Sequence, residues 1–150
     1  MGLEAIRKFL KRNSRIALDS NIFIYQFEEN IRYQPLTHLV FEALEHGEIS
    51  AVTSTITVTE LLVPAYRAQD GARVDELYGL LATHPLLEWV APDLEIADLA
   101  AELRTGYNLR TPDALQAATA IQRTATGFLT NDLQFERLGH FETLVLDRIL

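Results

Sequence analysis

The sequence predicts an α/β fold in which helices cover both faces of a central, mostly parallel sheet. Segments with the apolar pattern of a strand alternate with helical segments along the whole chain. The chain has 150 residues, of which 48% are hydrophobic, so it can build a core and is not expected to be disordered. No internal repeat, low-complexity stretch or linker interrupts the alternation. We therefore expect one domain over residues 1–150, with a basic helix over 1–14 ahead of the first strand.

The first elements follow from apolar spacing and from residues that stop helices. Apolar side chains recur at helical spacing over 3–12, with basic side chains on the other side. The apolar run over 15–19 ends abruptly on an acid, as expected for a buried strand. A helical turn is expected over 21–29, and a helix over 35–45 begins at a proline and stops before Gly47.

The middle of the chain continues with a second strand over 48–53. Ser54 or Thr55 can cap the next helix. Pro64 would kink or interrupt that helix unless the chain bends there. A further helix is expected over 69–83, because its apolar residues fall on one side.

The last part of the chain repeats the order of strand and helix. Asp93, after Pro92, opens a helix that Gly106 is expected to close. The expected elements of this part are strands over 86–90, 127–130 and 144–146 and helices over 93–104 and 111–124.

Composition excludes several classes of function. The chain has no cysteine, which rules out disulfides, thiolate metal sites and a cysteine nucleophile. No apolar run is long enough to span a bilayer, and the first 15 residues lack the apolar core of a signal peptide, so a cytoplasmic location is expected. The net charge of −8 argues against a protein that coats nucleic acid. Five of the 13 basic residues nevertheless lie within the first 15 positions.

Four acids stand near places where open parallel sheets hold their active sites, the carboxyl ends of strands. Asp19 ends the first expected strand, and Asp132 follows the fourth by two residues. Glu60 lies in the helix after the second strand, and Asp113 opens a largely apolar helix. Taken singly, Asp113 could complement a helix dipole, Asp132 could cap a turn, and Glu60 could be exposed at the edge of its helix. Asp19 is harder to explain in this way, since a buried acid is rarely found without a partner or a metal.

The four acids together predict a metal site. Such a cluster, with no basic residue expected to neutralise it, repels itself, and a divalent cation removes that repulsion. Ligands that offer only oxygen favour Mg²⁺ or Mn²⁺.

Four short motifs, in this order, resemble those of PIN-domain ribonucleases. Each motif is weak alone, but the four in order, spread over residues 16–146, make a specific signal. The subgroup that the chain resembles best is the VapC-type toxins of bacterial toxin–antitoxin pairs. The motifs are Leu18-Asp19-Ser20-Asn21, Thr57-Val58-Thr59-Glu60-Leu61-Leu62, Thr111-Pro112-Asp113-Ala114-Leu115-Gln116-Ala117-Ala118 and Leu129-Thr130-Asn131-Asp132.

This resemblance implies a three-layer α/β/α sandwich and metal-dependent cleavage of RNA. It also implies a homodimer and inhibition by a cognate antitoxin protein. The basic helix ahead of the first strand departs from the family, whose members commonly begin close to the first Asp-containing strand. That departure bears on how partners bind.

A division of roles follows as a hypothesis. Asp19 and Asp113 ligate the metal directly, whereas Glu60 and Asp132 act through water or complete a second site. Asn21 and Thr130 orient ligands or contact substrate, although Asn21 could instead cap the helix that follows it. Cations at the rim would help to attract RNA, although they could equally form a solvated basic face. The candidate cations are Arg7, Lys8, Lys11, Arg12, Arg15 and Arg110.

Two other functions remain as alternatives. Phosphatases of the haloacid dehalogenase type also place an aspartate at the end of strand one, but they need a second aspartate where this chain has Asn21. Some PIN domains act as scaffolds or RNA-binding modules after losing acids, whereas all four acids are present here.

Overall fold

Five parallel strands form the centre of the computed structural model, which describes residues 1–150. Their order across the sheet is β3-β2-β1-β4-β5, and every neighbouring pair is parallel. The mostly parallel sheet predicted from the sequence is therefore confirmed. The strands are β1 (Arg15–Leu18), β2 (Ser50–Ser54), β3 (Leu87–Val90), β4 (Gly127–Thr130) and β5 (Glu142–Val145).

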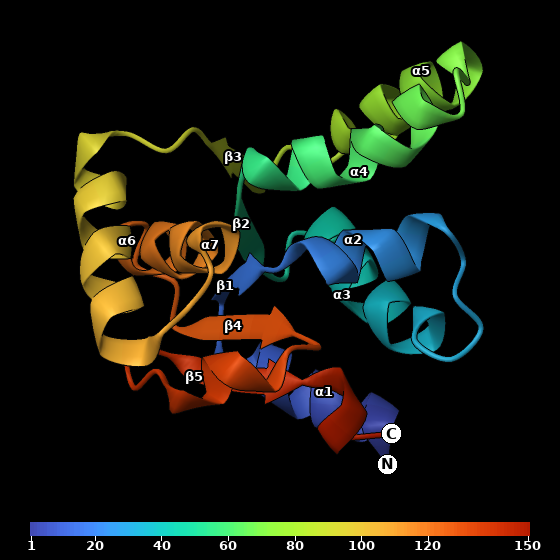
Figure 1. The fold of residues 1–150 in the computed structure, drawn as a ribbon. Helices are drawn as coiled ribbons and strands as arrows, with labels where there is room; N and C mark the ends of the chain where they lie inside the picture. The colour runs from blue at the N-terminus through green and yellow to red at the C-terminus, as the bar shows by residue number, and fades with distance from the viewer.

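Helices cover both faces of this sheet, as the alternation of elements predicted (Figure 1). One layer contains α1, α2 and α3, the other contains α6 and α7, and the α4–α5 pair extends away from the sheet. None of the helices has the length and apolar character that a membrane span requires. The helices are α1 (Gly2–Arg12), α2 (Ser20–Phe27), α3 (Gln34–Glu45), α4 (Ile56–Arg67), α5 (Gly71–Leu81), α6 (Leu94–Tyr107) and α7 (Thr111–Gln122), with 3₁₀ turns η1 (Leu133–Arg137) and η2 (Leu146–Arg148).

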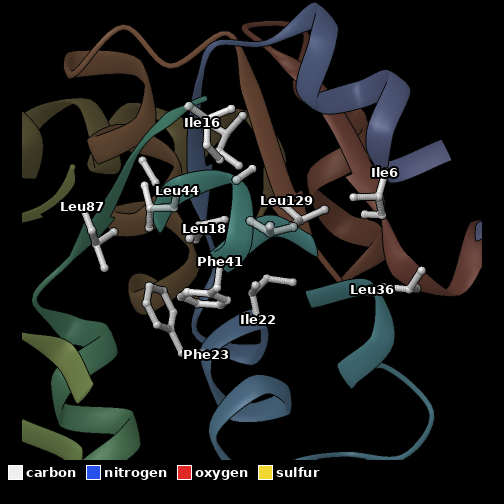
Figure 2. Close-up of a cluster of buried hydrophobic side chains, with 14 of the residues drawn as sticks. Ile6, Ile16, Leu18, Ile22, Phe23, Leu36, Phe41, Leu44, Leu87 and Leu129 are labelled. Carbon is white, nitrogen blue, oxygen red and sulfur yellow. The ribbon is translucent and has the colours of Figure 1, made fainter. Parts of the chain in front are cut away.

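Two separate apolar cores lie on the two faces because side chains alternate along each strand. Ile16 and Leu18 of β1 join the core under α1, α2 and α3, in which Phe23 and Phe41 meet edge to face (Figure 2). Ala17, between them, joins the core under α6 and α7. Both faces of the strand are buried, so its carboxyl end emerges from the interior of the molecule.

Three details differ from the sequence prediction. Helix α6 runs through Gly106 and ends at Tyr107, and the left-handed backbone of Asn108 (φ 55°) caps it in place of the glycine. Helix α4 continues through Pro64 to Arg67, so the proline does not interrupt it. The fifth strand begins at Glu142, two residues before the expected segment, because its ladder with β4 sets its position.

Helix α1 packs tightly against the rest of the molecule. Ile6 and Phe9 are fully buried, and Arg12 forms a bidentate ion pair with Glu142 at the start of β5. Gly127 of β4 has no room for a side chain, since a Cβ there would lie 2.7 Å from the Phe9 ring and 2.9 Å from Asn13 Cγ. The helix also brings the two termini side by side (Figure 1).

Replacement of Gly127 by alanine should therefore loosen α1 and cost about 1–3 kcal/mol of stability through overpacking. Urea unfolding measures this loss. Gly139→Ala is the matched control, because a Cβ at that position meets nothing within 4 Å. Equal stabilities of the two variants would contradict the close packing of Phe9 on β4.

Candidate active site

The sheet changes direction at β1, and this point places two of the predicted acids together. From β1 the chain moves outward through β2 and β3, then returns to the other side of β1 for β4. Crevices at such switch points, outside the carboxyl ends of the strands, are where open α/β sheets bind ligands. Asp19 directly follows β1, and Asp132 lies two residues beyond β4.

Asp19 is buried, with 7% of its surface exposed, and both of its carboxylate oxygens accept hydrogen bonds. Oδ1 caps α2 by accepting from the backbone N–H of Ser20 at 2.8 Å, and Oδ2 accepts from the Thr130 hydroxyl at 2.7 Å. Burial raises the pKa of Asp19 to about 7, although these two hydrogen bonds oppose the shift. The negative charges of Asp113 and Glu60 raise it further.

Thr130 connects Asp19 to Asp132. Its hydroxyl group donates to Asp19 and accepts from the backbone N–H of Asp132 at 3.0 Å. The Asp132 carboxylate then caps η1, where it accepts from the backbone and side-chain N–H groups of Gln134 at 3.0 and 2.9 Å. The orienting role of Thr130 stays a prediction, and its hydroxyl group is placed to hold the Asp19 carboxylate.

Asp113 lies in the first turn of α7 with 8% of its surface exposed. Burial raises its pKa, and the charge of Asp132 adds to this shift. Arg110 opposes it, because its Nε donates to Asp113 Oδ2 at 3.2 Å. The Arg110 side chain is itself 76% exposed, so this ion pair is a weak one that can open.

Glu60 lies on α4 at the exposed rim of the same region. Partial desolvation raises its pKa, and the charge of Asp113 raises it as well, while the Ser20 side chain lowers it. The structure thus brings all four predicted acids into one region, in which Asp19, Glu60 and Asp113 repel one another and Asp132 repels Asp113. No three Asp, Glu or His side chains, however, already have the spacing of a metal site.

Two other expectations about the site need correction. Asn21 does not cap α2, because Asp19 does, and its Oδ1 is buried without a hydrogen-bond partner. Arg12 and Arg15 do not line the rim, because they lie near the amino-terminal edge of the sheet and pair with Glu142 and Glu88. Of the predicted rim cations, Arg110 is the one in contact with the acids.

Sequence reasoning missed three buried polar side chains beneath the acids. Ser20, Thr57 and Gln116 form hydrogen bonds to one another across α2, α4 and α7. One signal was present in the sequence, since Gln116 interrupts the apolar run from Ala114 to Ala118 on a helix expected to be buried.

Comparison with known families shows to which family the chain belongs. The model of the PIN domain family matches residues 16–140, most of the chain and all four acids. This chain belongs to the PIN domain family. A search of curated protein sequences finds no match.

Solved structures share the fold of this PIN domain. A toxin–antitoxin complex from Klebsiella pneumoniae aligns at a TM-score of 0.67 and 22% identity, covering 87% of this chain and 97% of that one. VapBC2 from Rickettsia felis, bound to a DNA fragment from its promoter, aligns at a TM-score of 0.68 and 19% identity, covering 87% of this chain and 98% of that one. VapBC-1 from nontypeable Haemophilus influenzae aligns at a TM-score of 0.67 and 21% identity, covering 89% of this chain and 98% of that one.

The raised pKa of Asp19 should make the metal-free PIN domain less stable at higher pH. Between its usual value near 3.8 and about 7, the folded state holds a proton that the unfolded state has lost. Stability is therefore greatest below this window and falls until the pH passes 7. Between pH 5.5 and pH 8 the loss should be about 2 kcal/mol, and Asp19→Asn should remove it. Urea unfolding of both proteins at the two pH values measures the effect, and equal pH dependence would contradict it.

Proposed function

We propose that this PIN domain is a metal-dependent endoribonuclease that hydrolyses phosphodiester bonds in RNA. The observation that carries the proposal is the group of four acids around the carboxyl ends of β1 and β4, where Asp19 and Asp132 follow the strands and Glu60 and Asp113 come from α4 and α7. Natural proteins seldom bury an acid such as Asp19 beside other acids unless a cation or a reaction uses it.

The donor set fits Mg²⁺ or Mn²⁺, because these hard cations prefer carboxylate oxygens and keep part of their coordination shell for water. A bound cation would also relieve the repulsion that adds to burial in raising the pKa values of Asp19, Glu60 and Asp113. Because the acids are not yet at ligand spacing, binding requires small side-chain movements. The exposed Arg110 can release Asp113 at little cost.

The side chains divide this work by position. Asp19 and Asp113, the two buried acids, would hold the ion directly, while Glu60 and Asp132 act through water or complete a second position. Thr130 holds Asp19 in place, and Arg110, once released, can contact a phosphate of the substrate. A bound divalent cation would supply an activated water and polarise the scissile phosphate.

The biological role that we propose is that of a VapC-type toxin held by an antitoxin protein. The three matched structures are toxin–antitoxin or VapBC complexes of other organisms, which supports this assignment. A homodimer is proposed only from the resemblance of the four motifs to those of VapC-type toxins. The RNA substrate is inferred from the family and from the charge reversal that a bound cation would give this acidic site.

Conversion of either buried acid to its amide should abolish cleavage. Asp19→Asn and Asp113→Asn each remove a negative ligand, and we expect Mn²⁺-dependent cleavage of a fluorescent single-stranded RNA to fall about 100-fold or more. Asp98→Asn, at an exposed acid of α6, is the matched control and should cleave like the unmodified protein.

Calorimetric titration with Mn²⁺ accompanies the cleavage assay. Retained activity in both variants would refute the site. A wild-type chain that binds no Mn²⁺ and cleaves no RNA would instead favour the scaffold function.

A further inference from the structure

A buried network of neutral polar groups lies under the four acids. Its centre is Gln116 of α7, whose side chain is 3% exposed. The Gln116 Nε2 group donates to Thr57 Oγ1 at 2.8 Å and lies 3.4 Å from Ser20 Oγ. Its Oε1 accepts from the backbone N–H of Ser54 at 3.2 Å. One side chain thus joins α7 to α2, to α4 and to the end of β2.

The hydroxyl groups around Gln116 close the network. Thr57 Oγ1 lies 3.3 Å from Ser20 Oγ and 2.8 Å from Thr53 Oγ1. Thr53 also donates to the carbonyl oxygen of Leu18, the residue before Asp19, at 2.8 Å. All of these side chains are buried, so each hydrogen bond is costly to leave unmade.

The two side chains to which Gln116 donates, and Gln116 itself, lie within three residues of an acid in the chain. Ser20 directly follows Asp19, and Thr57 precedes Glu60 by three residues on α4. Gln116 itself follows Asp113 by three residues on α7. Because residues three apart share one face of a helix, the network fixes the parts of α2, α4 and α7 from which three acids project.

Those three acids repel one another. In addition to burial, the charges of Asp113 and Glu60 raise the pKa of Asp19, and the charge of Asp113 raises the pKa of Glu60. A lysine or arginine in place of Gln116 would neutralise them but would compete with a cation. A neutral amide offers both donors and an acceptor without adding charge. A neutral amide can therefore hold the three repelling carboxylates close together without neutralising their negative charges.

We propose that Gln116 is a positioning residue that sets the spacing of Asp19, Glu60 and Asp113 before a metal ion arrives. The test of this inference by Mn²⁺ binding rests on the proposed function. The positions of the side chains are given by the hydrogen bonds, whether or not a metal binds. It adds to the four acids a residue that does not touch metal or substrate.

The first experiment compares Gln116→Met with Gln122→Met. Methionine keeps the volume of glutamine but makes no strong hydrogen bond. Gln122 is on the same helix and donates to Asp93, away from the site, so its variant is the matched control. Calorimetry with Mn²⁺ should show affinity about tenfold weaker for Gln116→Met and unchanged for Gln122→Met. Wild-type affinity in Gln116→Met overturns the proposal.

A second pair of variants separates positioning from stability. Thr57→Val removes the main partner of Gln116, and the double variant Gln116→Met/Thr57→Val leaves neither partner unsatisfied. The double variant should regain part of the unfolding temperature lost in Gln116→Met, yet its Mn²⁺ affinity should stay weak. If affinity returns together with stability, Gln116 has a merely structural role and the proposal fails.

A third measurement decides the question if the wild-type chain binds no Mn²⁺, a result that would overturn the metal role proposed above. Crystal structures of metal-free wild-type and Gln116→Met proteins then give the distances between the carboxylates of Asp19, Glu60 and Asp113. Carboxylates that separate in the variant support the positioning role. Unchanged distances overturn it.

Discussion

The burial of one carboxylate at the end of the central strand constrains the rest of the site. Asp19 must leave solvent because β1 is covered on both faces and ends inside the molecule. Its two hydrogen bonds, from Ser20 and Thr130, oppose but do not cancel the cost of burial, and its pKa stays near 7. The negative charges of Asp113 and Glu60 add to that cost. The buried carboxylates therefore cost free energy, and a positive charge bound among them would reduce that cost.

Stability elsewhere in the molecule offsets this local cost. Two apolar cores pack against the two faces of the sheet, and a neutral donor, the Thr130 hydroxyl group, holds Asp19 without neutralising it. Proteins commonly give up stability at functional sites in this way. The one ion pair at the site, between Arg110 and Asp113, is exposed on the arginine side and adds little.

The sequence predicted the parts of this arrangement that depend on local pattern. Apolar runs marked the strands, so the ends of β1 and β4, and with them Asp19 and Asp132, could be located. Contacts between distant residues could not be predicted, because no local pattern encodes which side chains meet. The bonds of Gln116 to Ser20 and Thr57 join residues 96 and 59 positions apart. The position of β5 likewise depends on its ladder with β4, and the end of α6 on a left-handed Asn108.

The charges are divided between the two edges of the sheet, and this division bears on how RNA could approach. At the amino-terminal edge, Arg12 and Arg15 are engaged with Glu142 and Glu88 and lie far along the strands from the acids. At the carboxyl-terminal ends of the strands, the negative charges of Asp19 and its neighbours would repel the phosphate backbone of the proposed RNA substrate. The proposed cation would then have two functions at once, since the ion that activates water would also make the site attractive to its substrate. On this view, binding of RNA depends on the metal as strictly as its cleavage does.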